Sequence, residues 1–411
     1  MKRFTETEEL NPALVKDSLT EVLRNGAKKI LQEALEIEIE TFLEGYRELT
    51  LSDGRRRIVR NGYHKQRSIL TGIGPIDAEV PRAYDREGSL NFTSSILPAY
   101  LRKTKSVEEL LPWLYLKGIS TGDFPEALSA LIGSNAKGLS PNVISRLKGK
   151  WEDEYHNWRA RDLSGKHYVY FWVDGVYCNV RMDDNKQCLL VIIGALEDGK
   201  KELVALEEGY RESEQSWKEV LIDLKDRGLK EWPKIAAGDG AMGFWAALRK
   251  VAPETKEQRC WMHKTGNILN NMPKNLQAKA KDHIHQIWMA ATLKEAEKAF
   301  NSFIEKYEAK YPKATQCLAK DKEKLLTFYN FPGEHWRHLR TTNPIESTFA
   351  TVKLRTNKVR GCFSRTTVLT MAFKLIESNQ KRWQRLHSSH LLGKLIEGIK
   401  FINGIAEQYA A

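Results

Sequence analysis

The stretch from His167 to Leu196, HYVYFWVDGVYCNVRMDDNKQCLLVIIGAL, constrains the fold more than any other part of the chain. Three apolar runs in it are rich in β-branched and aromatic residues, which favour strands. The pair DG and the tract MDDNKQ separate these runs, and both are typical of turns. The stretch therefore predicts an antiparallel meander whose first strand ends at Asp174.

The pattern after the meander alternates between helix and strand. EQSWKEVLIDLKDRG predicts an amphipathic helix ending at Gly228, and AMGFWAALRKV predicts a second helix. KIAAGDG and KEQRCWM predict short strands before and after that second helix. From Thr265 to about Asn330 the chain reads as polar helix, and helix returns near Asn343. This order predicts an α+β fold, with a mixed sheet flanked by helices and interrupted by a helical insertion.

The N-terminal half reads as helix, then short strands, then helix again. Apolar residues at helical spacing predict a helix from Asn11 to Glu48. Cations crowd the turn-rich segment 52–67, and segment 68–88 predicts short strands or a hairpin. Residues 106–155 predict short helices joined by a turn. Such a pair forms either a helix-turn-helix unit that lays its last helix on DNA or an ordinary helical pair.

Composition points to a polyanionic partner. The 411 residues carry 65 lysines and arginines against 53 acids, a formal net charge of +12. A surplus of this size favours phosphate-rich partners, because each neutralised phosphate releases a counterion. The five cysteines lack paired spacings and read as reduced thiols. Without an apolar signal core or a membrane-length apolar run, the expected location is cytoplasmic.

Two aspartates follow apolar segments that are predicted to be buried in the sheet. Asp174 lies in FWVDG and Asp239 in IAAGDG, and each precedes a glycine. Either residue alone could simply start a turn. On neighbouring strands, however, the two carboxylates would face each other and repel unless a cation joined them or one took a proton.

Glu346 is the only acid in the cationic stretch HWRHLRTTNPIESTFATVKLRTNKVR. Asn343 and Pro344 predict a helix start, which places Glu346 in the first turn, where the helix dipole favours an anion. Glu346 could therefore only complement that helix end. Four cations that follow it point to a further role, because they could hold a phosphate backbone close to the acid; these are Lys353, Arg355, Lys358 and Arg360.

Three carboxylates of this kind could bind two divalent ions. Hard oxygen ligands select Mg²⁺, with Mn²⁺ as a substitute. Two such ions roughly 3.5–4 Å apart serve in-line phosphoryl transfer without a protein nucleophile. The sequence thus predicts a metal-dependent enzyme that acts on nucleic acid.

Motifs along nearly the whole chain resemble the Mutator-type transposases of bacterial insertion sequences. The motifs occur in the family's order: RNGYHKQRSILTGIGPIDAEVPR, LYLKGIST, LSPNVISRL, YFWVDGVYCNVR, DLKDRGL, GDGAMGFWAAL, QRCWMHKTGNIL and HWRHLRTTNPIES. The resemblance implies a ribonuclease-H-like core interrupted by an all-helical insertion. It also implies a DDE triad that falls on Asp174, Asp239 and Glu346. The family typically cuts at terminal inverted repeats and joins the 3′ ends to target DNA.

Three further residues are expected to support the core. Cys260 and His263, in CWMH, match the family's C-x2-H signature. By chemistry alone this pair is either half a zinc site or a packing and hydrogen-bonding element beside the catalytic strands. Trp336 is expected in the core, with stacking on an unpaired base as the alternative.

The remaining predicted sites are contacts to DNA. Arg340 is expected to clamp a phosphate oxygen. With the cations after Glu346, the predicted DNA-binding residues include two N-terminal groups: Arg55, Arg56, Arg57, Arg60, Arg146 and Lys148.

Six regions are predicted along the chain. They are a helical DNA-binding or dimerisation segment (1–60), a small β-containing region (61–103), a helix-turn-helix-like DNA-binding region (104–165), the first part of the core (166–264), the all-helical insertion (265–333) and the second part of the core (334–411).

The predicted function is that of a DNA transposase working as a homodimer on double-stranded DNA. Its N-terminal half binds the element ends, and its core performs Mg²⁺-dependent strand cleavage and transfer. Two alternatives remain: a structure-specific nuclease with the same core, and a transposase-derived DNA-binding regulator without catalysis.

Overall fold

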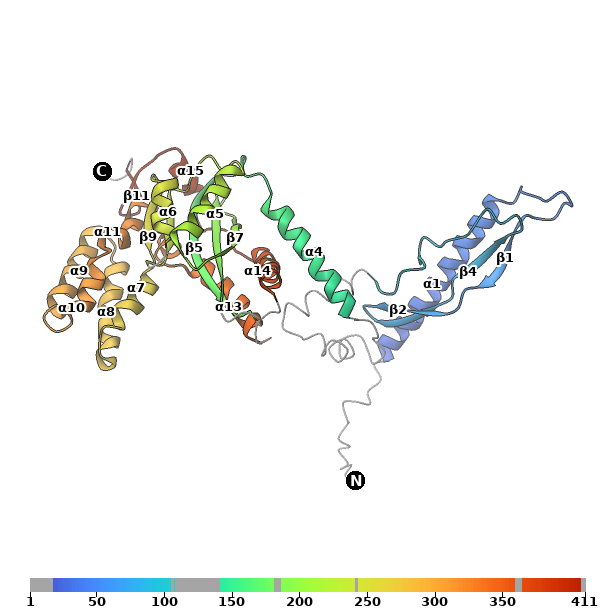
Figure 1. The fold of residues 1–411 in the computed structure, drawn as a ribbon, viewed down its shortest axis with the longest axis horizontal. Helices are drawn as coiled ribbons and strands as arrows, with labels where there is room; N and C mark the ends of the chain where they lie inside the picture. The colour runs from blue at the N-terminus through green and yellow to red at the C-terminus, as the bar shows by residue number, and fades with distance from the viewer. Residues whose placement is uncertain are drawn as a thin grey trace, which may run out of the picture. The chain divides into compact units, whose positions relative to one another are not determined.

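A computed structural model of the chain describes residues 18–104, 107, 141–180, 186–240, 243–358 and 364–407. The chain divides into two compact units, Met1–Arg146 and Leu147–Ala411. Figure 1 shows both, with labels on most of the helices and many of the strands.

The N-terminal unit packs one long helix against two pairs of short strands. Its elements are α1 (Ser18–Gly45), β1 (Ile58–Tyr63), β2 (Arg67–Thr71), β3 (Gly74–Ala78) and β4 (Pro81–Asp85). β1 pairs with β4, and β2 pairs with β3, both antiparallel. Leu35 of α1 is buried against a core that includes Ile69 and Leu97. The predicted helix is confirmed over 18–45, whereas β1 occupies part of a basic segment expected to be turn.

The predicted helix-turn-helix region lies mostly outside the described residues. Residues 105–106 and 108–140 are not described, and α4 (Pro141–Arg159) is the helix that remains. Tyr155 of α4 is buried, and its hydroxyl donates to the Leu206 carbonyl at 2.9 Å. The C-terminal part of α4 therefore belongs to the second unit.

The second unit is built on a mixed sheet flanked by helices. Its first elements are β5 (Tyr168–Cys178), β6 (Gln187–Leu196), β7 (Lys201–Gly209), α5 (Glu214–Asp226), β8 (Ile235–Gly238), α6 (Phe244–Val251) and β9 (Lys256–Arg259). Among the described residues, these five strands form one sheet in the order β7-β6-β5-β8-β9. β7, β6 and β5 run antiparallel, whereas β8 and β9 run parallel to β5. The predicted α+β class is confirmed.

Two of the predicted strands prove to be one. Asp174 and Gly175 do not form a turn, because they pair with Val191 and Leu190 inside the continuous strand β5. The third strand of the meander is instead β7, a segment not predicted to be a strand. A glycine is needed at position 175 because its missing side chain leaves room for the Glu212 side chain, and not because the chain turns there.

The two faces of β5 have different neighbours. Phe171 and Val173 point into an apolar cluster with α5 and α6, including the buried Trp217. On the other face, the Tyr170 hydroxyl lies 2.8 Å from His335 Nδ1, and Trp172 Nε1 donates to the His338 carbonyl at 2.7 Å. Because side chains alternate along a strand, Asp174 belongs to this second face.

The remainder of the chain is helical apart from one short strand pair. In order, its elements are α7 (Trp261–Leu269), α8 (Lys274–Met289), α9 (Leu293–Tyr307), α10 (Pro312–Ala319), α11 (Lys322–Leu325), η1 (Thr327–Asn330), η2 (Gly333–His335), α12 (Trp336–Leu339), α13 (Asn343–Lys358), α14 (Arg365–Gln380), α15 (His390–Ile396), β10 (Phe401–Ile402) and β11 (Ile405–Ala406). Figure 1 shows α7 to α11 gathered on the β9 side of the sheet. None of the described helices combines the length and apolarity that crossing a membrane requires.

Candidate active site

The sheet register brings Asp174 and Asp239 to equivalent positions on neighbouring parallel strands. Val173 of β5 pairs with Gly238, the last residue of β8. The residue after each member of this pair carries a carboxylate. The strand-end placement predicted for Asp239 therefore holds, and Asp174 reaches the same level from within a longer strand.

Burial and neighbouring acids make Asp174 hard to ionise. Burial is the main cause that raises its pKa to about 7, and the negative charges of Glu212 and Glu346 add to the effect. The Gly175 N–H donates to Asp174 Oδ1 at 2.8 Å, and this bond opposes the rise, as does the nearby His263. A carboxyl held in this state is expected where several anions share a site that a cation can fill.

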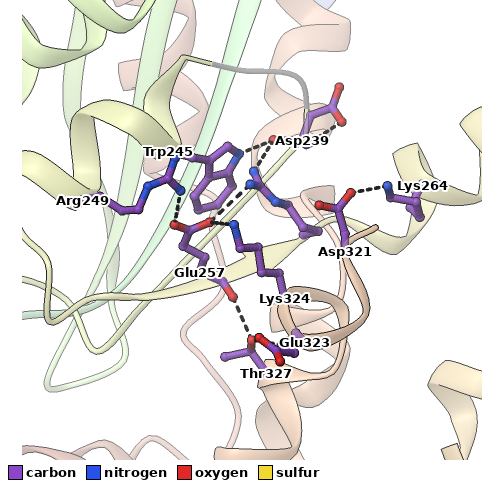
Figure 2. Close-up of polar contacts among 11 residues, drawn as sticks. Asp239, Trp245, Arg249, Glu257, Lys264, Asp321, Glu323, Lys324 and Thr327 are labelled. Carbon is purple, nitrogen blue, oxygen red and sulfur yellow. Dashed lines mark hydrogen bonds and ion pairs between the residues drawn. The ribbon is translucent and has the colours of Figure 1, made fainter. Parts of the chain in front are cut away.

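Two side chains hold the backbone at Asp239 (Figure 2). Trp245 Nε1 donates to the Asp239 carbonyl at 2.6 Å, and Arg259 Nη1 donates to it at 3.5 Å. The Arg259 guanidinium also stacks over the Trp245 ring, 4.1 Å from the ring centre. Glu257 fixes Arg259 through an ion pair of 3.2 Å and pairs with Lys324 at 3.1 Å. The loop after β8 is thus tied to β9 and α11.

Trp245→Phe should destabilise the protein by about 1–3 kcal/mol and lower the metal-dependent activity that the sequence predicts, because the Asp239 carbonyl loses its indole donor. Trp217→Phe is the matched control. Trp217 is buried in the same apolar cluster, but its Nε1 has no acceptor among the described residues. Denaturant unfolding and an activity assay on both variants measure the difference. Equal losses for the two would mean that the hydrogen bond to Asp239 contributes nothing.

Glu346 lies in the first turn of α13, as the sequence predicts. The Glu346 N–H donates to the Thr342 carbonyl at 3.0 Å. The Thr342 hydroxyl, fully buried, donates to Glu346 Oε1 at 2.6 Å. His263 Nδ1 lies 3.8 Å from the same oxygen. The Glu346 side chain is 39% exposed, so its carboxylate is oriented by Thr342 and still open to solvent.

Cys260 and His263 adjoin this acid. Cys260 is buried just before α7, and its sulfur accepts from the Thr342 hydroxyl at 3.3 Å. One ligand atom from each of Cys260, His263 and Glu346 lies within 4.8 Å of the others. The hydrogen bond from His263 to Cys260, and the negative charges of Asp239 and Asp174, raise the pKa of His263 to about 9 against the effect of burial. A pKa of about 9 keeps His263 protonated at neutral pH, with Nδ1 3.8 Å from Glu346 Oε1.

Glu212 is a fourth carboxylate that sequence reasoning missed. It lies between β7 and the Ser213 N-cap of α5. A Cβ atom at Gly175 would lie 2.5 Å from the Glu212 carboxyl carbon, so the glycine makes room for this side chain. Burial, followed by the charge of Asp239, raises the pKa of Glu212. The signal in the sequence is the glycine after Asp174, which serves no turn.

Three of the four arginines predicted to bind DNA near residue 57 have acidic partners within the N-terminal unit. Arg57 makes a two-point contact with the buried Asp85 carboxylate, with both bonds at 2.9 Å. Arg60 pairs with Glu36 at 2.6 Å, and Arg55 pairs with Asp53 at 2.5 Å. Arg56 is exposed. The sequence could not distinguish these cases because the partners are distant or lie in turns.

Of the other residues predicted to contact DNA, some have side chains that the structure describes and some do not. Arg340 donates to the carbonyls of Trp288 and Trp336 and stacks on the Trp288 ring, so its guanidinium has partners within the protein. Arg146 and Lys353 are exposed, whereas Lys148 is partly buried. Arg355 and Lys358 belong to α13, but their side chains and the whole of Arg360 lie outside the described residues.

Trp336 is a core residue. It is 9% exposed, its Nε1 donates to the Phe331 carbonyl at 2.8 Å, and its ring meets the Tyr329 ring edge-on. The indole is therefore engaged within the protein and is not presented to a base.

Comparisons with known proteins agree on one family. The family model described as "Transposase, Mutator family" matches residues 1–386. The transposase for insertion sequence element IST2 of Acidithiobacillus ferrooxidans is 51% identical over 287 residues, covering 68% of this chain and 95% of that protein. The transposase for IS6120 of Mycolicibacterium smegmatis is 49% identical over 298 residues, covering 72% and 92%. The Drosophila P element transposase strand transfer complex aligns over 71% of this chain and 85% of that one, at 9% identity and a TM-score of 0.29, which is too low to establish a shared fold.

Proposed function

Since the chain belongs to the Mutator family of transposases, we propose that it mobilises an insertion sequence by a DDE mechanism. It binds the terminal inverted repeats of its element, cleaves DNA at the ends and joins them to target DNA. Asp174, Asp239 and Glu346 are the catalytic acids. The observation that carries this proposal is the placement of Asp174 and Asp239 at matching positions of the adjacent strands β5 and β8, with Glu346 near enough to add to the raised pKa of Asp174.

The sheet supports a ribonuclease-H-like core. Three antiparallel strands are followed by two that run parallel to the first, in the order β7-β6-β5-β8-β9. Helices α7 to α11 interrupt the path from β9 to α13 and form the proposed insertion. The two aspartates follow or lie within the central pair of strands, and the glutamate comes from the helix after the insertion.

The residues present fit Mg²⁺ or Mn²⁺. The three acids offer hard oxygen donors, and a fourth carboxylate, Glu212, lies beside them. Burial mainly raises the pKa of Asp174, and the charges of Glu212 and Glu346 add to it; a divalent cation would offset both effects. When bound, the cations supply the activation of water or a 3′-hydroxyl and the stabilisation of the leaving oxygen.

The surrounding side chains orient the acids and balance their charge. Thr342 directs one oxygen of Glu346, while Trp245 and Arg259 fix the backbone of Asp239. His263, protonated at neutral pH, places a positive charge 3.8 Å from Glu346 and offsets repulsion among the acids. A phosphate that enters the site therefore meets a cation at His263 as well as the acid cluster.

Incubating the protein with Mg²⁺, a labelled element end and a plasmid should yield joined product. Gel analysis separates this result from the alternatives: cleavage without joining would indicate a structure-specific nuclease. DNA binding without any metal-dependent chemistry would indicate a transposase-derived regulator. Omitting the metal is the control, and product formed without it would contradict the mechanism.

We further propose that the active form is a homodimer acting at the bacterial nucleoid, because both element ends must be held together for coupled joining.

A further inference from the structure

The N-terminal unit contains a pocket of about 640 Å³ formed by the start of β2, β4 and the segment 91–102. Lysine and arginine supply the charges of its lining: Lys65, Arg67, Arg82 and Arg102, with His64 beside them. Among the described residues that line the pocket there is no carboxylate. A concave site with only cationic charge is suited to an anion.

One acid near this pocket, Glu38, is engaged by two serines. Glu38 accepts hydrogen bonds from Ser94 and Ser95 and does not itself line the pocket. The exposed side chains of Lys65, Arg82 and Arg102 form no ion pair within the described ranges. They differ in this respect from Arg55, Arg57 and Arg60, whose charges are paired.

Arg67 gives the pocket a fixed wall. Its guanidinium donates to the carbonyls of Leu97 and Pro98 at 2.7 Å each and to that of Ala99. Its Nε is buried and finds no acceptor among the described residues. Burial, and then the like charge of Arg102, lower the pKa of Arg67.

We propose that this pocket seats the phosphate backbone of double-stranded DNA, with Lys65, Arg82 and Arg102 as its contacts. The polar side chains of Asn91 and Thr93 in the lining add neutral hydrogen-bond donors for phosphate oxygens. The proposal rests on the proposed function, since DNA is the substrate of that function. The proposed N-terminal DNA contact is therefore not the arginine run 55–60 but a pocket whose residues come from three separate segments, 64–67, 80–83 and 91–102.

A pair of charge-matched triple variants of the full chain tests this assignment. Lys65→Ala/Arg82→Ala/Arg102→Ala removes the unpaired cations of the pocket, and Arg55→Ala/Arg56→Ala/Arg60→Ala removes an equal charge from the run 55–60. Binding to a short random-sequence duplex is measured by fluorescence anisotropy at several salt concentrations. Because phosphate contacts are independent of sequence, the terminal repeat need not be known.

The pocket variant should bind at least about tenfold more weakly, and its plot of log K against log salt should flatten by about 2–3 units. The run 55–60 variant should stay close to the parent. Equal weakening of both would mean that only net charge matters, and an unchanged pocket variant would exclude the site. If the parent itself fails to bind duplex DNA, the proposed function fails as well. If the parent binds and the pocket variant binds equally well, only the assignment of the pocket is overturned. Circular dichroism on each variant verifies folding.

Discussion

Asp174→Asn, Asp239→Asn and Glu346→Gln should each lower strand transfer at least about 10³-fold, a larger loss than that of a single oxyanion donor. Each change keeps the size of the side chain and removes a negative charge from a site built on charge. The element-end binding attributed to the N-terminal regions should persist, since all three acids lie in the second unit, Leu147–Ala411. Joined product on gels and end binding by anisotropy measure the two properties separately.

Asp153→Asn is the matched control for these variants. Asp153 is an exposed acid on α4, so losing its charge should leave strand transfer unchanged. Activity retained by any one of the three site variants would remove that residue from the triad. Loss of end binding together with activity would point instead to a folding defect.

Asp174→Asn should also make the metal-free protein more stable above pH 7, by about 2–4 kcal/mol. The ordinary pKa of this group is 3.8, and in the folded protein it rises to about 7. The folded state therefore holds the proton more tightly than the unfolded chain. Between about pH 4 and pH 7 the free energy of unfolding of the parent falls as pH rises, because the unfolded chain releases this proton first. Above pH 7 the folded parent carries a buried charge that asparagine lacks.

Denaturant unfolding of parent and variant from pH 4 to pH 8 measures this effect. The stability difference should grow with pH and level off above about 7, because the carboxyl is then ionised in both states. Added Mg²⁺ should narrow the difference, since a ligand that binds the folded parent stabilises it. A difference independent of pH, or a variant less stable at pH 8, would contradict the account. Asp153→Asn again supplies the control.

Much of the core fold followed from local pattern. The helix at 214–226 and the short strand at 235–238 were predicted from apolar periodicity and a glycine stop. β7 was missed because its buried residues Leu203 to Leu206 are flanked by charges at both ends, as suits a strand at the edge of the sheet. The split of β5 into two strands came from treating Asp174 and Gly175 as a turn.

The candidate site was partly predictable for a related reason. An acid after a buried strand is visible in the sequence, and Asp239 and Glu346 both stand at the ends of regular elements. Glu212 was not predicted because its place in the site depends on Gly175, which lies in the distant strand β5. Pairing of Arg57 with Asp85 escaped because the two residues meet only after β1 and β4 associate. Local pattern reports which elements form, while side-chain partners depend on which elements meet.

The hydroxyl of Thr342 has one proton and two acceptors, the sulfur of Cys260 at 3.3 Å and the carboxylate of Glu346 at 2.6 Å. A buried donor left without an acceptor would cost about 1–3 kcal/mol. Here the alternative acceptor is already in reach, so a rotation of the hydroxyl about the threonine Cβ–Oγ1 bond can release the glutamate oxygen and leave the proton with an acceptor. The sulfur of Cys260 thus offers a second acceptor for the Thr342 proton, and Glu346 can exchange this hydrogen bond for another partner at little energetic cost.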